Sequence, residues 1–415
     1  MRKAGVVLAL AGICALSVFL VNCGSSSSRS TGLLYVLSEA ASTVSSFAID
    51  LGNGNLGLIS DKPSTCAGSN CGLPLNISLD STGKTALVLN QGPPATISGY
   101  TVNSDGSLSS PSVAATLGNT AVAMTRDTSG QFVFVVDEGN GSPTDCATTA
   151  DADCPLLWVF TTQSGSTTLT PASIHQLSRI PSSISAITFT PQTGSQKTLV
   201  FVTNIQDLSQ PPVDNTLSVF SIDSSGNVAE SKFSPYSTQV NPTVVQAVNT
   251  NPVGQNTGGL FVYIGNQGAS AGGMSTMQLC VTVDSDCSQD QVDNNLLKPI
   301  GTLLSLGQKP VATLVDPTNN FLYVACNTSN QVFAYRITTG TGILSGLTPP
   351  SQPTGAQPVS LAMRAGTNSA NGFLYVADSG ANGITGFTVG AKTGILSNSI
   401  AIVFVPGAPS GMAAK

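Results

Sequence analysis

Charged residues and histidine are scarce in this chain of 415 residues. Only 9% of the residues are Asp, Glu, Lys or Arg, whereas a typical soluble domain has about 25%. The net charge is −6 and no cluster of Lys or Arg occurs, so no nucleic-acid partner is expected. His175 is the single histidine, which excludes histidine-rich metal sites and acid–base chemistry that needs several histidines. The hydrophobic fraction of 41% argues against a disordered chain.

Long apolar runs are also missing, except at the amino terminus. Ala4–Val21 is apolar and follows the basic Met1-Arg2-Lys3, so residues 1–22 are predicted to be a signal peptide. Leu20-Val21-Asn22-Cys23 resembles the lipobox of bacterial lipoproteins, although Asn22 stands where that family prefers a small residue. The resemblance implies a lipid on Cys23, a Ser-rich tether over residues 23–32, and a body held outside the cytoplasm, in the periplasm or at the cell surface. The alternative is an uncleaved signal anchor.

The nine cysteines lack the spacing of a zinc site, because no Cys-x-x-Cys pair occurs. Cys14 lies in the signal peptide. Cys326 has no other cysteine near it in the sequence, so we expect it to be a buried free thiol. Apart from Cys23, the others form three local pairs, which favours loop-closing disulfides in an oxidising compartment, although spacing alone leaves the connectivity open. These pairs are Cys66 with Cys71, Cys146 with Cys154, and Cys280 with Cys287.

One strand-like string is present in seven copies, each ending on a small or polar residue. The copies are Leu34–Ser38, Ala86–Asn90, Val133–Asp137, Val200–Asn204, Val262–Asn266, Leu322–Cys326 and Leu374–Asp378. A second strand built around one aromatic residue follows each copy, with Cys280 in that place in the fifth. A segment that often opens on proline precedes the copies, and Asp, Asn and Gly mark tight turns. Each repeat therefore predicts about four short strands, the content of a propeller blade.

The repeats predict an all-β fold, a seven-bladed β-propeller of four-stranded blades over residues 33–415. The first copy, at Leu34-Tyr35-Val36, has no strand before it. The segment Gly407–Ala413 looks like that missing strand. We therefore expect the C-terminal strand to complete blade one and to close the ring, which leaves no open sheet edge at the junction.

Two sequence features resemble a known family. The strands Tyr375–Asp378, Tyr323–Cys326 and Phe201–Asn204 resemble the Tyr-Val-x-Asn strands of YVTN-type propellers. The turns Lys392–Ser397 and Gly340–Ser345 resemble the Thr-Gly-x-Leu turns of lactonase-like seven-bladed propellers, which include bacterial 6-phosphogluconolactonase. The resemblance covers nearly all of residues 33–415 and implies His, Glu and Arg groups around a central channel that hydrolyse a lactone.

The family's catalytic pattern is poorly filled in this sequence. Lactone hydrolysis needs a base and a donor for the oxyanion. The candidate bases are Asp137, Glu138, Asp378 and Glu39, and the candidate oxyanion partners are Arg126 and Arg364. Both arginines close predicted innermost strands, so we expect them at the tight-turn side of the propeller, away from catalysis. His175 is predicted in an outer strand of blade three.

The residues that end the seven copies have two interpretations. As a polar rim around the channel they would bind a carbohydrate, lactone or protein ligand, on the side where the longest loops lie. As turn residues, Asn and Asp merely cap the strand ends. The candidate rim consists of Ser38, Asn90, Asn204, Asn266 and Asn327, with Asp137, Cys326 and Asp378 in the remaining blades.

Two function classes follow from these features. The first is a lipid-anchored propeller outside the cytoplasm that acts as a binding or scaffolding module, with a membrane as partner through Cys23. The second is a lactonase-like hydrolase of sugar lactones, and whether the chain is an enzyme stays open. Two loops cluster carboxylates beside the pairs Cys146/Cys154 and Cys280/Cys287, but neither matches a calcium-binding pattern. We therefore expect no metal site and no cofactor.

Overall fold

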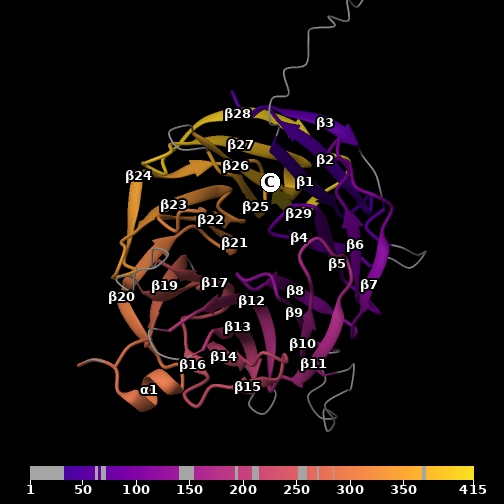
Figure 1. Cartoon of the computed structure of the whole chain (residues 1–415). Helices are drawn as coiled ribbons and strands as arrows, with labels where there is room; N and C mark the ends of the chain where they lie inside the picture. Colours follow the sequence, from indigo (N-terminus) through magenta and orange to yellow (C-terminus); the bar gives the residue numbers. More distant parts are fainter. Residues whose placement is uncertain are drawn as a thin grey trace, which may run out of the picture. The chain divides into compact units, whose positions relative to one another are not determined.

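The computed structural model describes most of the chain from residue 32 onward. The described ranges are 32–60, 64–66, 72–139, 154–191, 195–207, 215–250, 259–268, 271–283, 285–366 and 371–415. Residues 31–415 form one compact unit. Seven antiparallel sheets are arranged in a ring around a common axis (Figure 1). The predicted all-β, seven-bladed propeller is therefore confirmed.

The first three blades are listed from the innermost strand outward. Blade 1 contains β29 (Pro409–Ala414), β1 (Gly32–Ser38), β2 (Thr43–Ile49) and β3 (Leu56–Ser60). Blade 2 contains β4 (Pro74–Leu79), β5 (Thr85–Asn90), β6 (Thr96–Thr101) and β7 (Ser112–Thr116). Blade 3 contains β8 (Ala121–Arg126), β9 (Phe132–Asp137), β10 (Leu156–Thr161) and β11 (Thr170–Gln176).

The other four blades follow the same order. Blade 4 contains β12 (Arg179–Phe189), β13 (Lys197–Asp207), β14 (Thr216–Ile222) and β15 (Val228–Glu230), with β16 (Tyr236–Ser237) also on β14. Blade 5 contains β17 (Pro242–Asn249), β18 (Leu260–Asn266), β19 (Gly272–Leu279) and β20 (Leu297–Leu306). Blade 6 contains β21 (Pro310–Val315), β22 (Phe321–Cys326), β23 (Gln331–Ile337) and β24 (Leu344–Pro353). Blade 7 contains β25 (Pro358–Arg364), β26 (Gly372–Asp378), β27 (Gly383–Val389) and β28 (Leu396–Phe404).

The C-terminal strand closes the ring. β29 pairs antiparallel with β1, with Leu34 opposite Ala414 and Ser38 opposite Pro409. In Figure 1 the yellow end of the chain lies beside its indigo beginning, next to the innermost strands of blades 2 and 7. This pairing confirms the predicted closure and covers the edge that β1 would otherwise expose.

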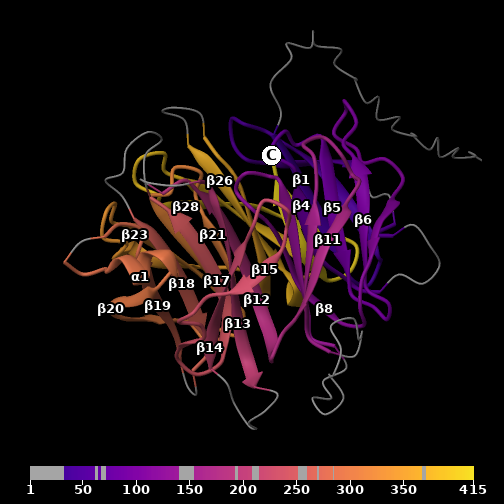
Figure 2. The same cartoon turned by 60° about the horizontal axis from the view of Figure 1, so that its bottom comes forward.

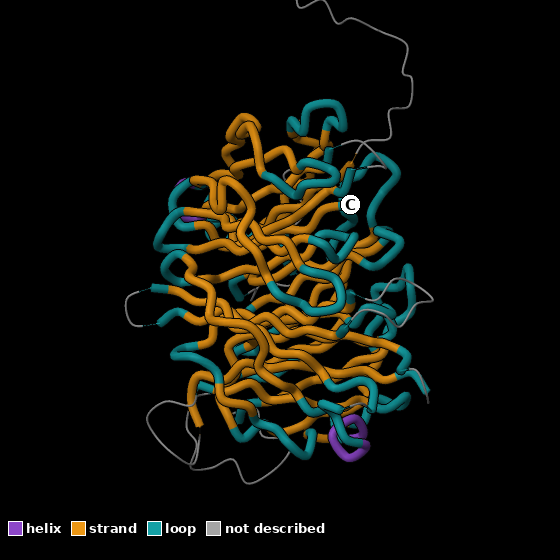
Figure 3. Tube along the Cα trace, turned by 90° about the vertical axis from the view of Figure 1, so that its left-hand side faces the viewer, coloured by secondary structure: helices purple, strands orange, loops and turns teal. Residues whose placement is uncertain are grey.

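Helix is nearly absent from the described residues, as the side view in Figure 3 shows. The described residues contain one short α-helix, α1 (Gln289–Asp293), and the 3₁₀ turn η2 (Ser379–Ala381). α1 lies between β19 and β20, in the connection that also holds the Cys280–Cys287 disulfide. Among the residues described, no helix has both the length and the apolar character needed to cross a membrane.

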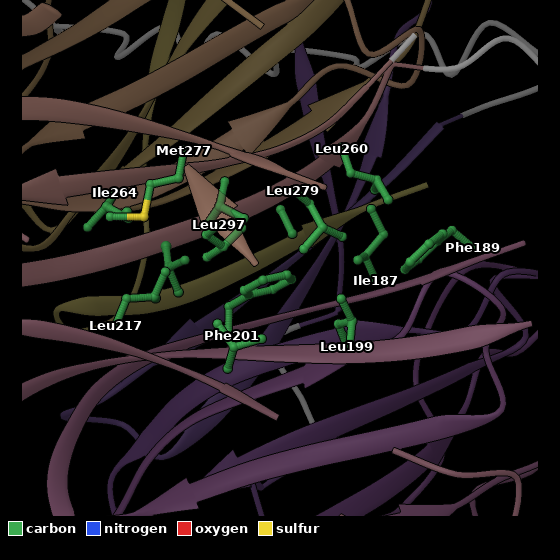
Figure 4. Close-up of a cluster of buried hydrophobic side chains, with 14 residues drawn as sticks. Ile187, Phe189, Leu199, Phe201, Leu217, Leu260, Ile264, Met277, Leu279 and Leu297 are labelled. Atoms are coloured by element: carbon green, nitrogen blue, oxygen red, sulfur yellow. The ribbon is translucent and has the colours of Figure 1, made fainter. Parts of the chain in front are cut away.

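The apolar core is divided into seven clusters, one at each interface between neighbouring blades. Figure 4 shows the cluster between blades 4 and 5, where Phe201 and Leu217 face Met277 and Leu297. The second strand of each blade, which carries the repeated string, is buried almost throughout. Burial on both faces explains why these strands are continuous apolar runs and not alternating ones.

The aromatic residue predicted in each third strand is buried in six blades. It lies opposite the first half of the second strand, as Phe387 lies opposite Leu374. In blade 5 the prediction that Cys280 occupies this place is wrong. Met277 lies opposite Val262 there and packs in the core, whereas Cys280 comes after β19 has ended and forms the disulfide.

The tyrosine of the repeated string joins neighbouring blades. Tyr375 of blade 7 donates a hydrogen bond from its hydroxyl to the carbonyl of Gly54, in the turn of blade 1 (2.7 Å). The same bond links Tyr263 to Gly342 (2.9 Å) and Tyr323 to Gly394 (2.8 Å). Tyr35 likewise bonds Gly106 of blade 2. The acceptor glycines have positive φ, which explains why the turns that meet these tyrosines contain glycine.

Candidate functional site

The axis of the propeller holds a cavity of about 450 Å³ lined by the innermost strands of all seven blades. Its wall is made of small apolar residues and of hydroxyl and amide side chains. The polar ones include Asn76, Thr125, Ser183, Ser185, Gln246, Thr313 and Ser360. Arg126 is the only ionisable residue among the described residues that line this cavity. The wall therefore suits a small polar ligand and offers one fixed charge.

The two ends of the cavity differ because the innermost strands all run in the same direction. Each begins opposite the last residue of the second strand of its blade, as Pro358 does opposite Asp378, and ends at the opposite side, as Arg364 does opposite Phe373. We call the side where the innermost strands begin the loop face, and the side where they end the turn face. Figure 1 shows the innermost strands around the axis, and Figure 2 shows part of the ring from a tilted view.

Hydroxyl groups close the seams between blades at the loop face. Ser182 donates to the carbonyl of Pro242 in the next blade (2.7 Å), and Thr243 donates in the same way to Pro310 (2.6 Å). Ser410 bonds the carbonyl of Pro74. A hydroxyl residue that directly follows a proline of an innermost strand thus ties its blade to the next one, and the same side chains line the cavity.

The candidate rim residues that end the second strands are buried at the loop face. Ser38, Asn90, Asp137, Asn204, Asn266, Cys326 and Asp378 are each at most 1% exposed. None of them lines the cavity, because the first residue of the innermost strand lies between each of them and the axis. They occupy the interior of the blades, one strand away from the channel.

Three asparagines of this group make the same bond inside their blades. The amide of Asn90 donates to the hydroxyl of Ser98 (3.2 Å), and Asn204 donates to Ser218 (3.0 Å). Asn266 donates to the hydroxyl of Ser275 (3.0 Å). The end of the second strand is thus fixed to the third strand through these side chains. Asn327, one residue beyond β22, instead donates to the carbonyl of Pro358 in the next blade (3.0 Å).

Asp137 and Asp378 occupy the same strand-end position as the asparagines. Oδ1 of Asp137 accepts backbone N–H groups of Thr120 (3.1 Å) and Gly139 (2.8 Å), yet burial raises the pKa of this carboxyl. Asp378 accepts the hydroxyl of Thr385 (2.6 Å). Burial raises the pKa of Asp378 to about 6, and hydrogen bonds from Thr385 and Gly355 offset part of that effect. The two acids lie in blades 3 and 7, which are not neighbours.

The structure places the candidate arginines at the turn face, as the sequence predicts. Arg126 is opposite Val133 in its sheet, whereas Asp137 is opposite Ala121, so the arginine and the acid are separated by roughly 16 Å of strand. Arg364 and Asp378 have the same relation in blade 7. Oxyanion partners and candidate bases are therefore not brought together in either blade.

The remaining candidates lie away from the axis. Glu39 and Glu138 are half-buried at the loop face, directly after strand ends, and burial together with the charge of Asp137 raises the pKa of Glu138. His175 is in β11, the outermost strand of blade 3, as predicted, and its ring contacts Phe220 of blade 4. Burial lowers the pKa of His175. A packing role at the blade interface is what this position supports.

The cysteine predictions are confirmed where the structure describes them. Cys280 and Cys287 form a disulfide with an S–S distance of 2.05 Å. Cys66 and Cys154 are also disulfide-bonded, while their predicted partners Cys71 and Cys146 lie outside the described residues. Cys326 is a buried free thiol, and burial raises its pKa to about 12, so it is not a nucleophile at neutral pH.

Some predicted features fall on residues that the structure does not describe. The signal peptide, Cys23 and the tether up to residue 31 lie outside the described residues, as does the acidic loop that contains Cys146. Within the described ranges no three His, Cys, Asp or Glu side chains form a group that suits a metal ion. The sequence does not predict the cavity wall, and the signal that could have found it is a hydroxyl residue directly after a proline of an innermost strand, as in Pro181-Ser182 and Pro242-Thr243.

Solved structures with the same fold cover nearly the whole chain. A candidate 6-phosphogluconolactonase of Bacteroides fragilis is 14% identical, with a TM-score of 0.64 over 94% of this chain and 100% of that one. The periplasmic gluconolactonase PpgL of Pseudomonas aeruginosa is 13% identical, with a TM-score of 0.63 over 93% and 99%. A Lactobacillus plantarum protein is 11% identical, with a TM-score of 0.61 over 93% and 99%. No protein-family model and no curated protein matches the sequence. At these identities the likeness shows the fold.

Proposed function

We propose that this chain is a propeller that works outside the cytoplasm and binds a small polar ligand in its axial cavity. The observation that carries the proposal is the cavity of about 450 Å³, with polar uncharged walls and a single ionisable residue. Binding needs hydrogen-bonding groups that converge on one space, and the innermost strands supply them. The strand-end acids lie outside this wall and are engaged within their blades.

The proposal includes a location outside the cytoplasm and an anchor at Cys23. The location is supported by the Cys280–Cys287 disulfide and by the bonded Cys66 and Cys154, because such bonds persist in oxidising compartments. The anchor rests on the lipobox-like Leu20–Cys23. Labelled palmitate should be incorporated by the wild-type chain and not by Cys23→Ser. Incorporation that survives this change refutes the anchor.

The second candidate function is hydrolysis of a sugar lactone. It is favoured by the fold shared with the gluconolactonase PpgL and by Asp378, whose pKa of about 6 is close to what a general base needs near neutral pH. Against it, the described residues provide no cationic donor beside Asp378 or Asp137, because Arg364 and Arg126 end strands at the turn face.

One experiment separates the two functions. The purified full-length chain in neutral detergent is titrated by calorimetry with monosaccharides, polyols and aldonolactones, and lactone turnover is measured on the same samples. We expect saturable binding that Ala312→Phe abolishes by filling the cavity, while Val113→Phe on the outermost strand of blade 2, where Val113 is 60% exposed, leaves it unchanged. Thermal unfolding confirms that both variants fold.

The result that contradicts the binding proposal is enzymatic turnover. Lactone hydrolysis above the buffer rate that Asp378→Asn, Asp137→Asn or Glu138→Gln abolishes would replace it with the hydrolase. Binding that Ala312→Phe leaves intact would place the ligand outside the cavity.

A further inference from the structure

The guanidinium of Arg126 is an incompletely bonded charge in the wall of the axial cavity. Arg126 is the last residue of β8 and lies at the turn face. Its Nε donates to the hydroxyl of Ser78 in blade 2 (3.2 Å). Its Nη2 is buried and has no hydrogen-bond partner among the described residues. A buried charged donor without an acceptor costs more than a neutral one, so this atom indicates a place where an acceptor is expected.

Two carboxylates lie near Arg126 without pairing with it. Asp80 and Asp127 follow the innermost strands of blades 2 and 3, and within the described ranges neither forms an ion pair with Arg126. Burial lowers the pKa of Arg126, and the charges of Asp80 and Asp127 offset this only in part. The charge on the guanidinium is therefore incompletely compensated.

The oxygens of both carboxylates are already engaged. Asp80 accepts the backbone N–H groups of Lys84 (2.8 Å), Thr85 (2.9 Å) and Gly165 (3.0 Å). Asp127 accepts Phe132 N–H (2.7 Å) and the hydroxyl of Thr188 (2.6 Å). These bonds build the turns after the strands. Neither carboxylate therefore supplies an acceptor for Nη2, and the cavity that Arg126 lines is the place where a ligand could supply one.

We propose that Arg126 binds the carboxylate of a small hydroxy acid that lies in the axial cavity. This inference rests on the proposed binding function and adds to it the charge of the ligand. A guanidinium matches a carboxylate because both are planar and form two parallel hydrogen bonds. Hydroxyl groups of the wall, such as Thr125 and Ser185, suit the hydroxyls of the ligand. The nearby Asp80 and Asp127 disfavour a ligand with two charges, such as phosphate near neutral pH.

Arg364 is a matched control inside the same molecule. It ends the innermost strand of blade 7 as Arg126 ends that of blade 3. Its Nη1 donates to the carbonyl of Ala365 (2.8 Å). Its Nε is buried without a partner, as Nη2 of Arg126 is, but Arg364 does not line the cavity. A change at Arg364 removes the same charge from the same face of the propeller and leaves the cavity wall intact.

Calorimetric titration of the full-length chain tests the inference, with glycerate as the probe. Glycerol is the neutral counterpart of glycerate, and inorganic phosphate is the anion with more charge. We expect saturable binding of glycerate and an affinity reduced about 10- to 100-fold in Arg126→Gln, as for the loss of a charged hydrogen bond. Arg126→Lys keeps the charge but loses the planar pair of donors, so it should weaken binding less than Arg126→Gln does. Arg364→Gln should leave the affinity unchanged.

Four outcomes would overturn the inference. They are no saturable binding of glycerate, an unchanged affinity in Arg126→Gln, an equal loss in Arg364→Gln, and phosphate binding as tight as that of glycerate. If Arg126→Gln does not fold, the test relies on Arg126→Lys. An unchanged affinity for glycerate in Arg126→Lys would also refute the two parallel hydrogen bonds from the guanidinium. Neutral sugars that bind in the cavity independently of Arg126 would refute this inference and leave the proposed function standing, whereas loss of all binding refutes both.

Discussion

The strand ends at the loop face and the wall of the axial cavity both carry polar side chains, but only the wall borders an open space. Asn204 and Asn266 are at most 1% exposed, and their amides donate to hydroxyls of the neighbouring strand. Arg126 lines a cavity and keeps one buried nitrogen without an acceptor. The strand ends also keep buried oxygens without a partner, such as Oδ1 of Asn266 and Oδ1 of Asp378, but these residues do not line the cavity. An unpartnered polar group supports binding only where its residue borders an open space, as Arg126 does.

This difference follows from the geometry of a blade. The second strand is buried between two neighbouring blades, so a polar group at its end must find a partner in the protein. The innermost strand faces the axis on one side, where space remains because seven strands do not fill the centre. Polar side chains in that position border the cavity even where they also bond within the wall, as Ser185 accepts the backbone N–H of Ala247 (3.0 Å).

The largest effect on the free energy of unfolding is expected at a strand end. Asn266→Ala removes the hydrogen bonds to the carbonyl of Ile264 (3.0 Å) and the hydroxyl of Ser275 (3.0 Å) inside a buried site, so we expect it to lower the free energy of unfolding by about 2–4 kcal/mol. Thr313→Ala in the cavity wall should change it by about 0.5 kcal/mol or less. Denaturant unfolding measures both. Equal losses would remove the distinction between scaffold and cavity wall.

A smaller effect is expected for Asp378, which occupies the same strand-end position as the asparagines. The pKa of Asp378 is about 6 in the folded protein, raised by burial from 3.8, so the folded state holds this proton more tightly than the unfolded state. Stability should therefore fall as the pH rises from about 4 to 6 and stay lower above that range. Asp378→Asn lacks this titration and should be more stable than the wild type by about 2 kcal/mol at pH 8.

Thermal or denaturant unfolding at pH 4 and pH 8 checks this prediction. The Asp378→Asn variant should differ from the wild type mainly at pH 8. A variant that is less stable than the wild type at both values would show that the ionised carboxylate contributes something that an amide does not.

The smallest effect tests a bond between blades. Tyr375→Phe removes the hydroxyl that donates to Gly54 at the junction of blades 7 and 1 and should cost about 1 kcal/mol. Tyr323→Phe removes the equivalent bond to Gly394 and should cost about the same. Blade 4 has Phe201 at the corresponding place, so the apolar ring itself is accepted there. A far larger loss of stability in Tyr375→Phe than in Tyr323→Phe would indicate that ring closure depends on this one bond.

Much of the fold is predictable because short sequence motifs recur in each repeat. The tyrosine, the final Asn or Asp and the opening proline each have one structural role that recurs from blade to blade, as Tyr323, Asn266 and Pro242 show. The position of Cys280 was misjudged because the fifth blade has a long connection with a helix after β19. The sequence therefore predicts Cys280 at the core position that Met277 occupies in the structure.

The cavity site is much less predictable from the sequence. Arg126 and Arg364 have equivalent places at the ends of innermost strands, yet only Arg126 lines the cavity. The bond from Arg126 to Ser78 joins two blades, and the carboxylates of Asp80 and Asp127 are occupied by turn contacts. These relations depend on how neighbouring blades are rotated about the axis, which no local pattern encodes.

The central claim is that ligands bind at Arg126 inside the cavity and not at the acids of the loop face. A crystal structure of the full-length chain with saturating glycerate tests this most directly. The account predicts density for a carboxylate within hydrogen-bond distance of Arg126 Nη2, with Ser78 still bonded to Nε. Density for the ligand beside Asp137 or Asp378, with the cavity empty, would contradict it.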